Sequence, residues 1–223
     1  MLDESLPVAE LVLEHPELAP VLQRHHIDSC CRGDVPLAEA ARTRGLDLSA
    51  LRTELTEALG GPGTGELDPR CLSTTALVAH IVERYHEPLR RSLPYLLSLA
   101  QKVAGVHGTR EPRFGELAVI VEELADELTS HLDEEETTLF PLLLAGTPQG
   151  VDLEDALRET LSEHLALALL LDRIRAATDD HHVPEWACTS VTTLMRKLHE
   201  MEGELLRHVH LENHVLALRF AGP

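Results

Sequence analysis

Four segments in the later part of the chain repeat apolar residues every three or four positions, which is the period of an α-helix with one buried face. They span residues 72–104, 112–145, 151–178 and 184–220, and proline or glycine interrupts the pattern between them. Four long helices with short connections typically pack as an antiparallel bundle. The pattern therefore predicts an all-α fold built around an antiparallel four-helix bundle.

Composition agrees with packed helices. Hydrophobic residues make up 43% of the 223 positions but aromatic residues only 3%, so Leu, Val and Ala must fill the interior. Two prolines, Pro88 and Pro94, fall inside the first predicted helix. Because proline lacks an N–H group, we expect kinks in that helix.

A segment rich in glycine and proline separates the bundle from a shorter N-terminal part. Between residues 60 and 70 lie four of the thirteen glycines and two of the thirteen prolines. We place a linker at 61–70, between a small helical domain at 1–60 and the bundle at 71–223. A domain of about 60 residues is marginal by itself, so docking or homodimerisation are open alternatives for its stabilisation.

Each predicted bundle helix carries one histidine on its apolar stripe. The four are His86, His131, His164 and His208. Two of them are followed one helical turn later by a glutamate on the same face, Glu135 and Glu212. Other histidines fall off the stripes, namely His80, His199, His210 and His214. On the third helix the stripe runs through Leu157, Leu161, His164 and Leu171.

Burying these six polar groups without compensation would cost several kcal/mol for each carboxylate. A lone core histidine is more often a hydrogen-bonded residue than a ligand, but the joint pattern favours a metal site. Four imidazoles and two carboxylates suit two transition-metal ions bridged by both carboxylates, with positions left open for water, an oxo group or a small ligand. Such a pair in a bundle favours iron or manganese over zinc, and we predict two irons.

Side chains near these six are expected to have simpler roles. Glu134 and Glu136 are predicted to lie on a solvated face, and His181 and His182 in a loop. His107, just beyond Gly105, could continue the first stripe and is a weaker candidate for an outer-shell role at the metal centre. Cys71 and Cys188 are expected to be structural thiols.

Two related kinds of di-iron protein fit the spacing poorly. A ferritin-like centre uses two Glu-x-x-His pairs, and here only Glu83 and His86 form one. An oxygen-carrying hemerythrin would have a second histidine one turn after His164, where this chain has Ala168. The predicted centre is therefore more open and more symmetric.

Several short motifs occur along nearly the whole chain. They are Asp28-Ser29-Cys30-Cys31, Leu37-Ala38-Glu39-Ala40-Ala41, Arg84-Tyr85-His86, Ser130-His131-Leu132, Ser162-Glu163-His164 and the run from His208 to Asn213. In combination they resemble the RIC (repair of iron centres) family, whose members carry a hemerythrin-like di-iron domain after a short cysteine-bearing domain. Arg32, Leu165 and the pair Ala217-Leu218 depart from the family pattern.

The resemblance implies a ligand set that agrees with the stripes. It makes His86, His131, His164 and His208 terminal iron ligands, with Glu135 and Glu212 as bridging carboxylates. It also implies a redox or partner-contact role for Cys30 and Cys31. Taken alone, adjacent cysteines do not easily close an unstrained disulfide, and packing is the alternative.

The resemblance implies repair of iron–sulfur clusters damaged by nitrosative or oxidative stress. Repair would proceed by iron donation, by NO binding and reduction at the di-iron centre, or by both, with damaged iron–sulfur proteins as clients and an electron donor of unknown identity. Whether the protein is an enzyme stays open. The alternative function is a hemerythrin-like NO or O2 sensor or carrier without turnover.

Charge excludes several other partners. Lys and Arg number 19 against 38 Asp and Glu, a net charge of −19 at pH 7 that repels nucleic acid and anionic membranes. No apolar run approaches the roughly 20 residues of a membrane span, and the first residues lack a signal-peptide pattern. We expect a cytoplasmic protein, in which the four cysteines are not structural disulfides.

Overall fold

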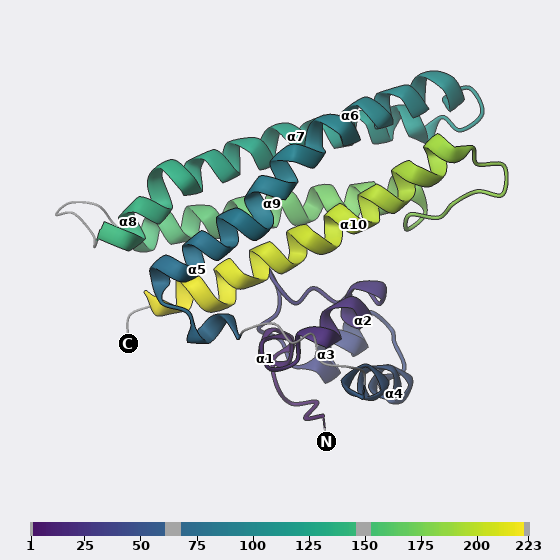
Figure 1. Ribbon diagram of the computed structural model, residues 1–223. Helices are drawn as coiled ribbons and strands as arrows, with labels where there is room; N and C mark the ends of the chain where they lie inside the picture. Colours follow the sequence, from purple (N-terminus) through teal and green to yellow (C-terminus); the bar gives the residue numbers. More distant parts are fainter. Residues whose placement is uncertain (1, 61–67, 146–152, 221–223) are drawn as a thin grey trace. The chain divides into compact units, whose positions relative to one another are not determined.

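The computed structural model describes residues 2–60, 68–145 and 153–220 (Figure 1). The chain forms two compact units, one comprising Ser73–Leu205 and the other Met1–Leu72 together with Leu206–Pro223. Most of the predicted linker lies outside the described residues, because 61–67 are not among them. None of the described helices is long and apolar enough to cross a membrane.

Four helical stretches make the predicted bundle (Figure 1). The first comprises α5 (Thr74–Ile81), a π-helical turn (Val82–His86) and α6 (Glu87–His107). The second comprises α7 (Arg113–Glu134), a π-helical turn (Glu135–Leu139) and α8 (Phe140–Ala145). The third is α9 (Leu153–Thr178), and the fourth is α10 (Thr189–Leu211) followed by a π-helical turn (Glu212–Leu216) and the 3-10 turn Ala217–Arg219. The all-α prediction is confirmed, although the fourth helix begins at Thr189 rather than near residue 184.

The core of this bundle is aliphatic. Helix α6 packs against α7, and α7 packs against α9. Fully buried leucines recur along α7, namely Leu117, Leu124, Leu128 and Leu132. Burial of each such side chain stabilises the fold by about 1.5–3 kcal/mol. The predicted stripe of α9 was wrong at Leu161, which is exposed and forms an outward row with Leu165 and Leu169.

The three π-helical turns all contain predicted ligands. His86 ends the first, Glu135 begins the second and Glu212 begins the third. Pro88 and Pro141 follow the first two turns, where a missing N–H group and a clash with the carbonyl four residues earlier favour a wider turn. Pro94 lies inside α6 without ending it.

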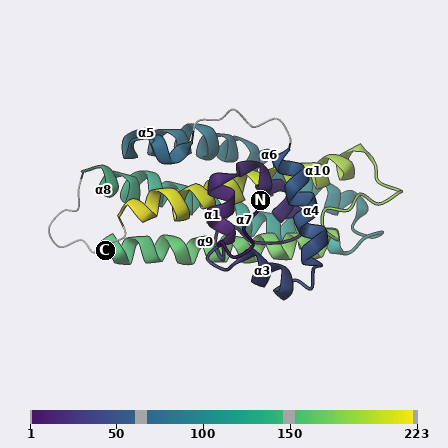
Figure 2. The ribbon, with the colours of Figure 1, turned by 90° about the horizontal axis from the view of Figure 1, so that it is seen from below.

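The other unit contains four short helices around their own core (Figures 1 and 2). They are α1 (Val8–Glu14), α2 (Ala19–Arg24), α3 (Leu37–Thr43) and α4 (Leu48–Leu59). Their buried apolar residues include Val8, Leu11, Leu18, Leu22, Leu37, Leu51 and Leu55. Gly33 sits so close to this packing that a Cβ atom there would lie 2.5 Å from the Ser29 carbonyl oxygen and 2.7 Å from Ala9 Cβ. The loop that carries the cysteine pair therefore needs glycine at this position.

Candidate metal centre

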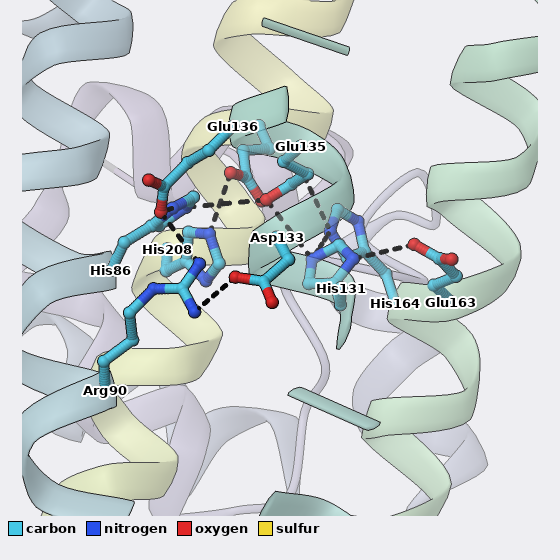
Figure 3. A network of polar contacts seen from close by, with 10 residues as sticks. His86, Arg90, His131, Asp133, Glu135, Glu136, Glu163, His164 and His208 are labelled. Carbon is cyan, nitrogen blue, oxygen red and sulfur yellow. Dashed lines mark hydrogen bonds and ion pairs between the residues drawn. The ribbon is translucent and has the colours of Figure 1, made fainter. Parts of the chain in front are cut away.

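Glu135 places a buried carboxylate among three imidazoles (Figure 3). Its Oε2 atom lies 3.5 Å from His86 Nε2 and 3.4 Å from His131 Nε2. Its Oε1 atom lies 3.9 Å from His164 Nε2. Residues from three helical stretches thus converge on one carboxylate, as expected for a group shared between two ions.

His208 and Glu212 form the second pair of predicted ligands. They lie one turn apart at the end of α10 and the start of its π-helical turn, and His208 Nε2 lies 2.8 Å from Glu212 Oε1. Both residues are buried. The two His-x-x-x-Glu pairs of the sequence therefore each bring an imidazole and a carboxylate together locally.

The six predicted residues gather into two groups that share both glutamates. One group is His86, Glu135, His208 and Glu212, and the other is His131, Glu135, His164 and Glu212. In each group the candidate ligand atoms all lie within 4.8 Å of one another, and every member is buried. Two imidazoles and two shared carboxylates per group fit a carboxylate-bridged pair of transition-metal ions.

The imidazole of His86 has a carboxylate partner outside these groups. Its Nδ1 atom lies 2.9 Å from Glu136 Oε1, and Arg90 Nη2 donates to the same oxygen at 3.1 Å (Figure 3). Arg90 also pairs with Asp133 at 2.7 Å. Burial alone would raise the pKa of Glu136, but hydrogen bonds from His86 and Arg90 outweigh it and lower the pKa. The expectation of a merely solvated Glu136 was wrong.

His131 has an equivalent partner on α9. Its Nδ1 atom lies 2.8 Å from Glu163 Oε2, and its Nε2 atom lies 3.1 Å from His164 Nε2. Burial and the nearby carboxylate of Glu159 raise the pKa of Glu163. An ionised carboxylate only accepts hydrogen bonds, so a carboxylate partner favours the tautomer in which Nδ1–H donates outward and the Nε2 lone pair is left for a metal ion. Helical periodicity missed both outer carboxylates because they lie beside the stripes.

The cysteine pair lies in a tight loop. Asp28 Oδ1 accepts hydrogen bonds from the backbone N–H groups of Cys30 and Cys31, each at 2.9 Å, and from Cys30 Sγ at 3.1 Å. The two sulfur atoms lie 3.6 Å apart. The contact with Cys31, together with burial, raises the pKa of Cys30 well above its ordinary value. Cys30 is therefore a protonated thiol at neutral pH.

Three residues just after His208 hold this loop by hydrogen bonds to its backbone carbonyl oxygens. His210 Nδ1 donates to the Ser29 carbonyl at 2.9 Å, and His214 Nε2 donates to the Cys30 carbonyl at 2.6 Å. Asn213 Nδ2 donates to the Cys30 carbonyl at 3.2 Å. Burial lowers the pKa of His210 to about 4, so its ring is neutral. These histidines lie off the apolar stripe because they contact the cysteine loop.

Two further expectations for single residues were wrong. Cys71 and Cys188 are both exposed, so neither is a packing thiol. His107 Nε2 contacts Cys188 Sγ at 3.2 Å, and its ring lies against Trp186. His107 thus belongs to a surface cluster near the start of α10.

Comparisons with known proteins cover both parts of the chain. Residues 4–59 match a family model named ScdA_N, a domain of unknown function, and residues 77–219 match the hemerythrin HHE cation binding domain. An iron-sulfur cluster repair protein ScdA from Staphylococcus haemolyticus is 31% identical, covering 98% of this chain and 99% of the relative. The iron-sulfur cluster repair protein YtfE from Edwardsiella ictaluri is 35% identical over 97% and 96%, and YtfE from Yersinia pestis is 32% identical over 92% of each. The chain therefore belongs to the ScdA/YtfE family of iron-sulfur cluster repair proteins.

Proposed function

We propose that this protein holds two iron ions and uses them to repair iron–sulfur clusters damaged by nitrosative or oxidative stress. In this proposal His86 and His208 hold one ion, His131 and His164 hold the other, and Glu135 and Glu212 bridge them. The observation that carries the proposal is that both four-residue groups share the same two buried carboxylates. Relatives across nearly the full length are named iron-sulfur cluster repair proteins.

The ions and the chain would contribute different things to repair. A pair of ferrous ions supplies two electrons and open coordination positions for a small ligand such as NO. The chain orients the imidazoles of His86 and His131, because Glu136 and Glu163 hold their Nδ1 atoms. All six candidate ligands are buried, which keeps bulk water away from the donor atoms. Repair then proceeds by release of iron to a damaged client, by NO binding and reduction, or by both.

The cysteine pair is part of the same proposal. Cys30 is buried and protonated, whereas Cys31 is partly exposed. We assign the pair a redox or client-contact role that is separate from holding the irons. Cys30 Sγ donates to Asp28, and the Cys30 carbonyl accepts hydrogen bonds from Asn213 and His214.

The first experiment measures metal identity and stoichiometry in protein purified without oxygen, by elemental mass spectrometry. We expect about two irons per chain, because the two groups offer two ion positions. A single zinc or no metal would overturn the proposal.

A second set of assays separates the routes of action on the iron-loaded protein. Transfer of iron to an apo cluster protein supports donation, and steady NO consumption with an added reductant supports reduction. Tight reversible NO or O2 binding without either activity would contradict repair and indicate a sensor or carrier.

A further inference from the structure

A second cluster of imidazole and carboxylate groups lies within Ser73–Leu205. His181, His199 and Glu202 offer ligand atoms that all lie within 4.8 Å of one another. Arg175 on α9 contacts Glu202 and lies eleven residues beyond His164, which is about 16 Å along the helix axis. The cluster is therefore a separate site near the turn between α9 and α10.

The turn that delivers His181 has an unusual backbone. Asp179, Asp180 and His181 have φ angles of 51°, 58° and 60°, a left-handed conformation that is unfavourable for residues other than glycine. Thr178 holds the turn, because its Oγ1 accepts from the His181 N–H at 3.0 Å and its carbonyl accepts from the His182 N–H at 3.0 Å. The turn directs His181 back towards α10.

Glu202 is the buried anchor of the cluster. It is 1% exposed, and its Oε2 atom lies 2.6 Å from His181 Nε2. Its other oxygen, Oε1, accepts a hydrogen bond from Arg175. Arg175 thus holds one carboxylate oxygen, and the other faces His181.

The two histidines differ in their surroundings. The His181 side chain is only 6% exposed, and among the described residues its Nδ1 atom has no hydrogen-bond partner. His199 precedes Glu202 by one turn of α10, is exposed, and lies with its ring centroid 5.5 Å from that of His181. An ion pair between Glu202 and His181 does not explain why the ring of His199 lies beside that of His181.

We propose that His181, His199 and Glu202 bind one divalent transition-metal ion of the class that includes Zn²⁺, Fe²⁺ and Co²⁺. Two imidazoles and one carboxylate suit these ions, with water completing the coordination. Tetrahedral bonds of about 2.0–2.1 Å place donor atoms about 3.3 Å apart, so an ion would bind as His199 rotates inward and the 2.6 Å contact between His181 and Glu202 opens. The positive charge of Arg175 makes the site weaker than the buried dimetal centre. The proposal does not depend on the identity of the two ions proposed above.

The test uses Co²⁺ as a spectroscopic probe, added to the full chain already loaded with metal at the other centre. We expect the wild type to bind one Co²⁺ per chain, seen as visible absorption bands and counted by equilibrium dialysis. His199→Ala should weaken this binding at least tenfold, because one of three protein ligands is lost. His182→Ala removes an exposed neighbouring histidine outside the cluster and should bind as the wild type does.

Three results would overturn the proposal. They are no Co²⁺ binding by the wild type, equal affinities in the wild type and His199→Ala, and binding that occurs only as the resident metal is lost. Glu202→Gln should also abolish binding, and circular dichroism checks that it folds. Because His199 is exposed, its alanine variant decides the question even if Glu202→Gln misfolds.

Discussion

The two halves of the candidate dimetal centre have similar inner groups but different outer ones. His86 and His131 contact carboxylates at 2.9 and 2.8 Å, and both carboxylates are half-buried. Glu136 is held by the guanidinium of Arg90, whereas Glu163 lies near another carboxylate, Glu159. The Arg90 guanidinium therefore partly offsets the negative charge of the outer carboxylate on the His86 side, and no such cation is described beside Glu163. Two ions bound by the same kinds of ligand would therefore experience different electrostatic fields.

The substitution with the largest expected effect acts on both halves of the centre. Glu135→Ala deletes a carboxylate that both groups share, so we expect loss of most of the iron from both positions. Elemental analysis measures the loss. Glu134→Ala is the matched control, because Glu134 is an exposed neighbour on the same helix. Equal iron content in the two variants would contradict the bridging assignment.

The next largest effects are expected from substitutions that act on one half of the centre only. Glu163→Gln removes an outer negative charge that has an acidic neighbour, and we expect a loss of about 10–100-fold in affinity for one iron. Glu136→Gln should cost less, because Arg90 already offsets part of the charge of Glu136. Competition with a chelator measures both affinities.

Glu159→Gln serves as the control for this pair of variants. It also removes a negative charge near Glu163 but leaves the His131 contact intact. A larger loss from Glu159→Gln than from Glu163→Gln would show that bulk charge, not the hydrogen bond, controls affinity.

A smaller effect is expected from Arg90→Gln. The change loosens Glu136, which weakens the hold on His86, but it also removes a positive charge near the ion. Because the two effects oppose each other, we expect the affinity for iron to change by less than about threefold. A change as large as that of Glu136→Gln would mean that Arg90 positions Glu136 more than it offsets its charge.

The smallest effect on iron should come from the cysteine pair. Replacing Cys30 and Cys31 together by alanine leaves all six candidate ligands in place, so we expect iron content and chelator kinetics to be unchanged. Iron transfer to a client or reductive activation should be lost in the same protein. Unchanged repair activity would indicate that the two cysteines have only a packing role.

Much of the bundle could be predicted because the helical period determines which residues share a face. This reasoning placed the four histidines and two glutamates on buried faces, and all six are buried. It failed at Leu161, because α9 carries leucines around much of its circumference and the period alone does not identify its buried side.

The sequence by itself determined the all-α fold, the bundle and the positions of the six polar groups along it, since these depend on local spacing. Only the tertiary structure decided which groups share Glu135 and Glu212, because that depends on how separate helices approach one another. It also decided the contacts of Glu136 and Glu163, whose long side chains reach neighbouring helices from positions beside the stripe. The left-handed turn at Asp179–His181 contains no glycine, so the sequence did not predict it. Contacts made by Thr178 stabilise this turn. Local spacing places side chains on a helix face, but packing selects their partners.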